Sequence, residues 1–379
     1  MDDQNIQTTK TTQITQDTRM SDKRQEARIS KTIIGVIVLL LVVVGGIAVL
    51  VSQNAENKNP QAAKVDGKSS TPTESQVATV PFYEMTIPSL RAREYNSQLG
   101  ELEELSNNGS YTSYQTSYES DGLRVNGLLT KPIGEMPKGG WPAIVFIHGY
   151  IPPTLYVTAE KYVDYVDYLA RNGFVVFKID LRGHGESEGE SGGGYYGSDY
   201  VVDALNASSA LATSGFVKPE AIGYWGHSMA GNAVMRVMAA RPETPAGVIW
   251  AGAVYSYLDQ RKYGINDNSY RPPVNDENRQ NRRRELFEKH GSPSAQSIFW
   301  QQVAPTSYLN DLKGAVEIHH AVDDDVVDIE YSRDLDIMLD EARVPHELFE
   351  YASGGHNIGG VSFVSAMQRT VDFFKEHLK

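Results

Sequence analysis

The feature that most constrains the fold is a series of five short, almost uninterrupted apolar runs beyond residue 140. Each run has four to six residues, and segments long enough to form a helix separate them. Strands of a parallel sheet have this composition when helices cover both faces of the sheet. The runs are Ala143–Ile147, Phe174–Ile179, Ala221–Trp225, Gly247–Ala251 and Ala315–Ile318. We therefore predict an α/β fold with a doubly wound, mostly parallel sheet.

The segments between and after these runs carry the helical pattern. We expect helices near Ala159–Arg171, Tyr200–Ser214, Asn232–Arg241, Asp328–Glu341 and Ser362–Leu378. Between residues 255 and 306 the composition shifts to Arg, Asn, Asp, Gln and Pro, and the strand–helix alternation stops. An insertion after a strand overhangs the carboxyl edge of the sheet, so we expect a small cap there. We interpret Arg282–Arg284 within it as a solvated helix face rather than a contact for a substrate carboxylate.

Two further elements are expected ahead of the parallel strands. Leucines among polar residues between 81 and 110 suggest one short amphipathic helix. They are Leu90, Leu99, Leu102 and Leu105. Tyr111–Tyr118 and Leu123–Pro132 alternate in the manner of strands on either side of Asp121–Gly122, which is a turn pair. A leading β-hairpin is therefore expected.

The amino-terminal part of the chain contains a candidate membrane anchor. Ile33–Val51 is a run of 19 residues without a charged side chain, about the length that crosses a ~30 Å apolar bilayer core. Basic residues are denser before this run than after it, which predicts a cytoplasmic amino terminus. A cleaved signal peptide is the alternative, but the lead before Ile33 is long and no A-x-A site follows Val51.

We therefore predict a cytoplasmic tail over residues 1–31, a transmembrane helix over 32–52, a flexible linker over 53–80 and a globular domain over 81–379. The lipid bilayer would contact Ile33–Val51, and the globular domain would lie outside the cytoplasm.

Composition excludes several classes of function. The chain has no cysteine, so neither a thiol nucleophile nor a thiolate metal site is available. Its net charge of −13 offers no broad basic face, so nucleic acid is not an expected partner. The oligomeric state does not follow from the sequence.

Ser228 lies in the run Gly226–Gly231, directly after an apolar strand and directly before a helix-like segment. A serine used as a nucleophile stands on such a sharp strand-to-helix turn, where its hydroxyl projects freely and backbone N–H groups gather beside it. Small neighbours make the turn possible. Gly226 fits the G-x-S-x-G pattern, whereas Ala230 replaces its second glycine and Gly231 follows at once. Ser228 is the predicted nucleophile.

His356 is the predicted catalytic base among nine histidines. It follows the apolar strand end Leu348–Tyr351, precedes the last helix, and has Gly354 and Gly355 before it. Such a loop brings an imidazole over the serine, where it takes the hydroxyl proton and later delivers it to the leaving group. The chain order of serine, acid and histidine also requires a late histidine.

The acid should follow the strand that begins at Ala315, and Asp323, Asp324 and Asp325 compete for this role. In folds of this kind the strand commonly ends in His-Gly, two residues intervene, the aspartate follows, and a valine stands three positions later. Alignment of that pattern with His319–Val326 selects Asp323, with Asp324 in reserve. His320 occupies the position of the glycine.

The oxyanion hole needs two preorganised donors. The backbone N–H of Met229, directly after the nucleophile, is one. Tyr150 supplies the second through its backbone N–H or its phenol, because His148–Gly149–Tyr150 ends the first buried strand. His148 itself precedes the serine and is assigned to bracing the loop rather than to catalysis.

No cofactor or metal is expected. A metal site built from His319, His320 and the neighbouring aspartates is disfavoured because adjacent residues of a strand point to opposite faces.

Taken together, these motifs resemble the α/β-hydrolase catalytic domain of the prolyl oligopeptidase family. The resemblance is carried by His148–Pro153, Asp180–Gly189, Trp225–Gly231 and the loops of Asp323 and His356, and it covers roughly residues 81–379. It implies that the Tyr150 hydroxyl donates to the oxyanion. It also implies a serine peptidase with a Ser228–His356–Asp323 triad and an acyl-enzyme intermediate.

One departure concerns the substrate. Peptidases of that family typically carry a β-propeller ahead of the hydrolase domain, and only about 60 residues separate Val51 from the leading hairpin, too few for a propeller. The expected function is a membrane-anchored serine hydrolase that cleaves a peptide or amide bond. A carboxylesterase acting on small acyl esters is the alternative, and a non-catalytic hydrolase-fold binding module is the third possibility.

Overall fold

The computed structural model describes residues 80–266 and 277–379, which belong to one compact unit. The predicted cytoplasmic tail, the transmembrane helix over 32–52 and the linker, apart from Val80, lie outside the described residues. Among the helices of the described part, none has both the length and the apolar composition needed to cross a bilayer.

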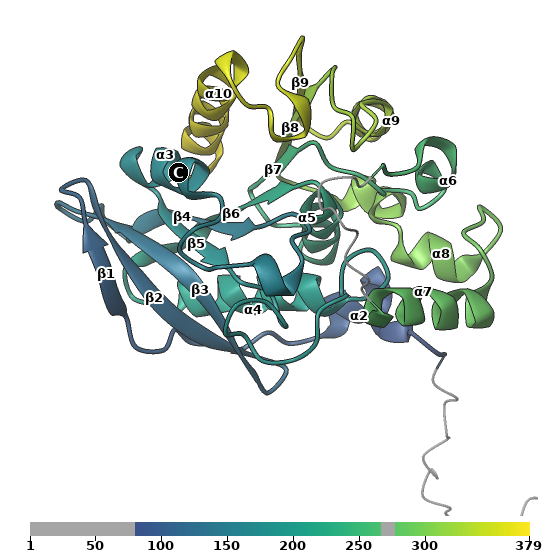
Figure 1. Cartoon of the computed structure of the whole chain (residues 1–379), viewed down its shortest axis with the longest axis horizontal. Helices are drawn as coiled ribbons and strands as arrows, with labels where there is room; N and C mark the ends of the chain where they lie inside the picture. The colour runs from purple at the N-terminus through teal and green to yellow at the C-terminus, as the bar shows by residue number, and fades with distance from the viewer. Residues whose placement is uncertain (1–79, 267–276) are drawn as a thin grey trace, which may run out of the picture. The chain divides into compact units, whose positions relative to one another are not determined.

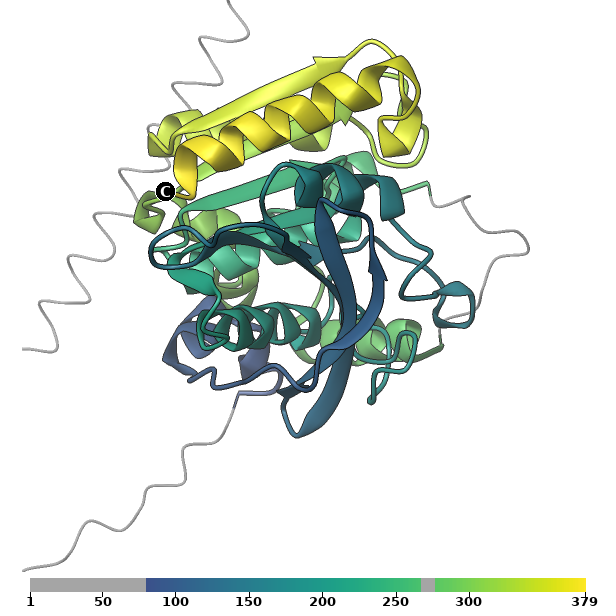
Figure 2. The same cartoon turned by 90° about the vertical axis from the view of Figure 1, so that its left-hand side faces the viewer.

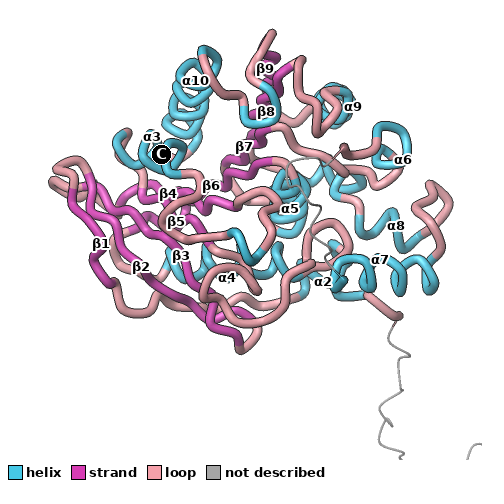
Figure 3. Tube along the Cα trace, in the orientation of Figure 1, coloured by secondary structure: helices cyan, strands magenta, loops and turns pink. Residues whose placement is uncertain are grey.

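The centre of the domain is a single nine-stranded sheet in the order β1-β2-β3-β5-β4-β6-β7-β8-β9. The strands from β4 to β9 are mutually parallel, and only the three leading strands run antiparallel to their neighbours. The sheet twists through the molecule as a continuous ribbon (Figure 3). The parallel strands are β4 Trp141–Ile147, β5 Val175–Ile179, β6 Val217–His227, β7 Ala246–Trp250, β8 Ala315–Ala321 and β9 His346–Tyr351. The prediction of a doubly wound, mostly parallel sheet is confirmed.

Helices cover both faces of this sheet (Figures 1 and 2). α3 (Val163–Arg171) and α10 (Val361–His377) pack on one face, and α4 (Asp199–Ala212) and α5 (Met229–Ala240) pack on the other. α9 (Glu330–Ala342) follows β8. The core therefore has two apolar layers separated by the sheet, which explains why the central strands are apolar on both sides.

The leading hairpin is present as predicted. It consists of β2 (Tyr111–Ser120) and β3 (Leu123–Pro132), whose last pair is Ser120 with Leu123. Asp121 and Gly122 both have positive φ, 58° and 75°, as a two-residue type I′ turn requires.

The predicted amphipathic helix before the hairpin is wrong in extent. Only α2 (Ile87–Ala92) is helical, whereas Glu103–Asn107 forms the edge strand β1 against β2 and Leu99 forms an isolated bridge to Tyr118. All five residues of β1 are exposed, so backbone pairing with β2 rather than side-chain burial decides this segment.

The cap segment is helical where it is described. It contains α6 (Asp259–Tyr263), α7 (Glu277–His290) and α8 (Ile298–Val303). Short 3-10 turns complete the elements at η1 Tyr83–Met85, η2 Pro153–Leu155, η3 Pro305–Asp311 and η4 Gly355–Asn357. On α7, Arg282 pairs with Asp199 at the start of α4, and the Arg283 guanidinium lies 5.7 Å from the centre of the Tyr196 ring. Arg282 therefore helps attach the cap to the domain, whereas Arg283 and Arg284 are exposed, as expected for a solvated helix face.

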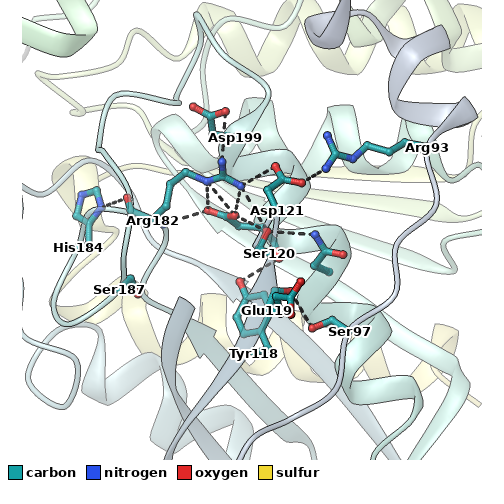
Figure 4. A network of polar contacts seen from close by, with 12 residues as sticks. Arg93, Ser97, Tyr118, Glu119, Ser120, Asp121, Arg182, His184, Ser187 and Asp199 are labelled. Carbon is teal, nitrogen blue, oxygen red and sulfur yellow. Dashed lines mark hydrogen bonds and ion pairs between the residues drawn. The ribbon is translucent and has the colours of Figure 1, made fainter. Parts of the chain in front are cut away.

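A buried ionic network fixes the loop after β5. The side chain of Arg182 binds Asp203 at 2.6 Å and Asp121 in the hairpin turn at 3.2 Å. Figure 4 shows its guanidinium between Asp121 and Asp199, with Arg93 reaching Asp121 from the opposite side. Because Asp199 also binds Arg282, this network connects the hairpin, the β5 loop and α4 to the cap.

Candidate active site

Ser228 occupies a strained turn between β6 and α5. Its φ and ψ are 56° and −120°, a backbone conformation that non-glycine residues rarely adopt. The surroundings hold it there, because its N–H donates to the Trp250 carbonyl at 2.8 Å and its own carbonyl accepts from Gly231 N–H at 2.9 Å. This is the geometry of a nucleophile elbow.

The glycines of the elbow are explained by close packing. A Cβ at Gly226 would lie 2.7 Å from the Ala230 carbonyl oxygen, and a Cβ at Gly231 would lie 2.8 Å from the Cα of Gly252. Ala230 is fully buried in the first turn of α5. Backbones therefore approach closely at both Gly226 and Gly231, whereas position 230 accommodates a methyl group.

His356 lies in the loop after β9 and is oriented by a carboxylate. Its Nδ1 lies 2.8 Å from Oδ2 of Asp324, whose side chain is 0% exposed. Asp323, the acid predicted from the sequence, instead accepts from the Gly355 N–H through Oδ1 at 2.8 Å. The predicted acid is therefore corrected by one position to Asp324. The turn after β8 directs the side chain of Asp324 inward, while residue 323 lies exposed at the surface.

The Asp324 carboxylate is held on both oxygens. Oδ1 accepts from the N–H groups of Val326 and Val327 at 2.9 and 3.0 Å, and Oδ2 lies 3.2 Å from Nε2 of His320. Burial alone would raise the pKa of Asp324, but the hydrogen bonds from His320 and His356 outweigh it and hold the pKa well below its usual range. Asp324 is therefore ionised at neutral pH.

Two of the histidines near Ser228 are structural. His148 is fully buried between the carbonyls of Gly149 and Asp180, at 2.7 and 3.2 Å. Burial, followed by the proximity of His184, lowers the pKa of His148 to about 3, so this ring stays neutral. The assignment of His148 to loop bracing agrees with these contacts.

His227, next to the nucleophile, connects two loops of the site. Its Nε2 donates to the His356 carbonyl at 2.8 Å, and its Nδ1 accepts from the Tyr162 hydroxyl at 2.7 Å. The same hydroxyl accepts from the Gly149 N–H at 3.0 Å. Burial and the nearby His356 lower the pKa of His227 to about 3, which matches the neutral form that these contacts need.

Ser228, His356, Met229 and Tyr150 line one cavity of about 790 Å³. Met229 is the first residue of α5, so its backbone N–H is one of the unpaired donors at a helix start. The Tyr150 ring is half-buried, and the Arg279 guanidinium of the cap lies 5.4 Å from its centre. Within the described residues no hydrogen bond joins the Ser228 hydroxyl to the His356 ring, and such contacts often tighten only when substrate binds.

The remaining lining of the cavity is aromatic and apolar with a few charges. Its other side chains include Ile151, Lys161, Tyr162, Tyr165, Tyr195, His227, Ile265, Arg279, Asp325, Val326 and Asn357. Besides His356, the charged side chains that line the cavity are therefore Lys161, Arg279 and Asp325.

No group of three or more His, Asp or Glu side chains in the described residues is arranged to hold a metal ion. His319 and His320 point to opposite faces of β8, as adjacent strand residues do. His319 bonds to Glu317 and Tyr351, and His320 faces Ser332 and Asp324.

Sequence reasoning missed three residues that support the site. Tyr162 and His227 form the connection described above, and His320 contacts the acid. Only His320 had a visible signal, because it stands where the common pattern has glycine. No pattern marked Tyr162, which reaches the site from the start of α3.

Comparison with protein families finds one match, to the family described as serine aminopeptidase, S33, over residues 142–265. Among curated proteins, an uncharacterized peptidase, YtmA, of Bacillus subtilis is 27% identical over 247 residues, which cover 64% of this chain and 85% of that protein. A polyketide transferase of Penicillium crustosum is 30% identical over 145 residues, 38% of this chain and 45% of its own length.

Solved structures show the same fold at low identity. The dipeptidyl peptidase 4 of Porphyromonas gingivalis matches with a TM-score of 0.55 and 20% identity over 71% of this chain, but only 36% of its own chain. The acetyl xylan esterase from Paenibacillus sp. R4 matches with a TM-score of 0.54 and 17% identity over 76% of this chain and 91% of its own. The acylaminoacyl peptidase of Pyrococcus horikoshii matches with a TM-score of 0.53 and 18% identity over 71% of this chain and 42% of its own.

Proposed function

This chain is a serine hydrolase with an α/β-hydrolase domain of the peptidase type, and from this premise we propose the reaction. We propose that the enzyme cleaves a peptide or amide bond through Ser228, His356 and Asp324. The family match and the Bacillus peptidase support the peptidase type. The observation that carries the proposal is the 2.8 Å contact from His356 to the ionised Asp324, in a loop that lines the same cavity as Ser228.

In this mechanism the hydrogen on Nδ1 of His356 is committed to Asp324, which leaves Nε2 as the proton acceptor. Nε2 takes the Ser228 hydroxyl proton as the oxygen attacks the substrate carbonyl. The backbone N–H of Met229 and a donor from Tyr150 stabilise the oxyanion. His356 then protonates the leaving group, and a water molecule activated by the same imidazole hydrolyses the acyl-enzyme.

A carboxylesterase is the second candidate. The Paenibacillus acetyl xylan esterase matches over nearly its whole length, as a stand-alone domain does, whereas the matched peptidase structures extend well beyond the shared region. Acyl transfer to water through the same three residues serves both substrates, so leaving-group chemistry separates the two candidates.

The test of the shared chemistry is labelling of the full-length protein with a fluorophosphonate. We expect the wild type to be labelled and Ser228→Ala to be unlabelled. Ser365→Ala, at an exposed serine of α10, is the matched control and should be labelled like the wild type. A folded wild-type protein that resists the probe would remove the hydrolase proposal.

The choice between amide and ester follows from turnover of aminoacyl p-nitroanilides against short acyl p-nitrophenyl esters. A peptidase should turn over both. If the protein hydrolyses the esters but none of a series of p-nitroanilides with different amino-acid side chains, the result favours the esterase.

We also propose that Ile33–Val51 anchors the enzyme in a membrane, with the catalytic domain outside the cytoplasm. The proposal is supported by the length of the apolar run and by the basic residues before it. Protease added to intact cells should remove the carboxyl-terminal domain, and protection of that domain, with cleavage only after lysis, would contradict the proposed orientation.

A further inference from the structure

We propose that His320 is a positioning residue for the catalytic acid: it donates a second imidazole hydrogen bond to Asp324 and thereby sets both the orientation and the strength of the His356–Asp324 pair. The inference rests on the proposed function and adds to it a residue that no triad pattern contains.

His320 is fully buried near the end of β8, and polar groups surround its ring. Nε2 lies 3.2 Å from Oδ2 of Asp324 and 3.0 Å from the carbonyl oxygen of Val327. Nδ1 lies 2.7 Å from Oγ of Ser332, on α9. Each ring nitrogen thus has a partner inside the protein.

These partners determine where one hydrogen lies. The Val327 carbonyl and the ionised Asp324 carboxylate can only accept, so Nε2 of His320 carries the hydrogen that they share. Ser332 can donate or accept, and it satisfies Nδ1 in either case. The ring therefore donates to Oδ2 of Asp324, the oxygen that also faces Nδ1 of His356.

The Asp324 carboxylate then has four donors. Two backbone N–H groups bind Oδ1, and the rings of His320 and His356 bind Oδ2. A carboxylate held by four donors has little freedom to rotate, so Oδ2 stays aimed at Nδ1 of His356. The contact of His320 with the Val327 carbonyl also closes the turn that carries the acid.

The second donor also affects the base. A hydrogen bond from His320 draws charge from Oδ2, which makes Asp324 a weaker partner for protonated His356. Removing that donor should strengthen the attraction between Asp324 and protonated His356 and move the acidic limb of the kcat/KM profile to higher pH. The other charged or titratable groups near His356 are Asp323, Asp325, His227, Lys161 and Arg279, and the variants below leave all of them in place.

The experiment compares His320→Ala and His320→Gln with the wild type in the full-length protein. Both are assayed on p-nitrophenyl acetate across a pH series. His319→Gln is the matched control, because it changes an equally buried imidazole on the same strand that faces away from the acid. Ser332→Ala removes the partner of Nδ1 while the imidazole remains.

We expect His320→Ala to lower kcat about tenfold or more with little change in KM, and to move the acidic limb upward. The Gln variant, which keeps a donor near the position of Nε2, should recover much of kcat and the wild-type limb. His319→Gln should retain the wild-type limb, since any loss there acts through stability alone. Ser332→Ala should fall between wild type and His320→Ala.

A His320→Ala protein with wild-type kcat and an unmoved limb would overturn the inference, as would equal effects in the His319→Gln control. If the Ala variant does not fold, Ser332→Ala decides by the same two readouts, and a wild-type kcat with an unmoved limb in that variant overturns the inference. Failure of the proposed function itself would be seen separately, as an absence of fluorophosphonate labelling and turnover in the wild type.

Discussion

The pair Asp324→Asn and Asp323→Asn tests the assignment of the catalytic acid most directly. Both changes replace a carboxylate by an amide of nearly the same size at adjacent positions. Only Asp324 contacts the His356 ring, whereas Asp323 contacts a backbone N–H. The two variants should therefore differ greatly in activity.

The expected loss in Asp324→Asn follows from its hydrogen bonds. The amide oxygen must remain toward the N–H groups of Val326 and Val327, so the amide NH2 faces Nδ1 of His356. Nδ1 can then only accept, which places the ring hydrogen on Nε2, and Nε2 can no longer take the serine proton. In a serine protease this tautomer change lowers kcat about 10⁴-fold, which is about 5.5 kcal/mol of transition-state stabilisation.

Asp323→Asn should lose less than about threefold, because its amide oxygen still accepts from the Gly355 N–H and the side chain is exposed. The assay is steady-state hydrolysis of p-nitrophenyl acetate at pH 8, with circular dichroism to verify folding. Equal losses in the two variants, or a larger loss in Asp323→Asn, would refute the assignment.

Three further changes have defined outcomes. Asp203→Asn should destabilise the domain by about 1.5–3 kcal/mol, measured by urea unfolding, because it removes the fully buried carboxylate of Arg182 and leaves only the more exposed Asp121 and Asp199 as anionic partners. His148 and His227 have pKa values near 3 in the folded chain and near 6.5 when unfolded, so only the unfolded state takes up protons as pH falls. The free energy of unfolding that depends on these two neutral rings is therefore at its full value above pH 6.5. It should decline by about 1.4 kcal/mol per pH unit for each ring toward pH 3, and urea unfolding at several pH values measures this slope. Arg279→Ala should raise KM about two- to fivefold for acyl substrates that carry a carboxylate, because a half-exposed ion pair is worth about 0.5–1 kcal/mol. The KM for neutral substrates should stay unchanged. The control, Arg284→Ala on the exposed face of the same helix, should change the KM of neither class of substrate.

Agreement between sequence and structure is closest where a local pattern and burial favour the same result. The central strands are apolar on both faces because helices cover both, so their composition alone predicts parallel strands. Asp121–Gly122 similarly predicts its hairpin, because both residues tolerate positive φ. Agreement fails at β1, whose five residues are all exposed and carry no periodic apolar signal. Its strand conformation depends on the edge that β2 presents.

The sequence by itself determined the α/β class, the strained elbow at Ser228 and the position of His356 in the last loop, because each follows from short-range chemistry: burial, a sharp turn and chain order. It did not determine which of three consecutive aspartates faces His356. Successive residues of a turn point in different directions, and only packing of that turn against β9 and α9 places Asp324 inward and Asp323 outward. The tertiary structure likewise decided that His320 replaces a glycine with a second donor to the acid, since that contact depends on the Val327 carbonyl and Ser332, which meet the ring only in the folded domain.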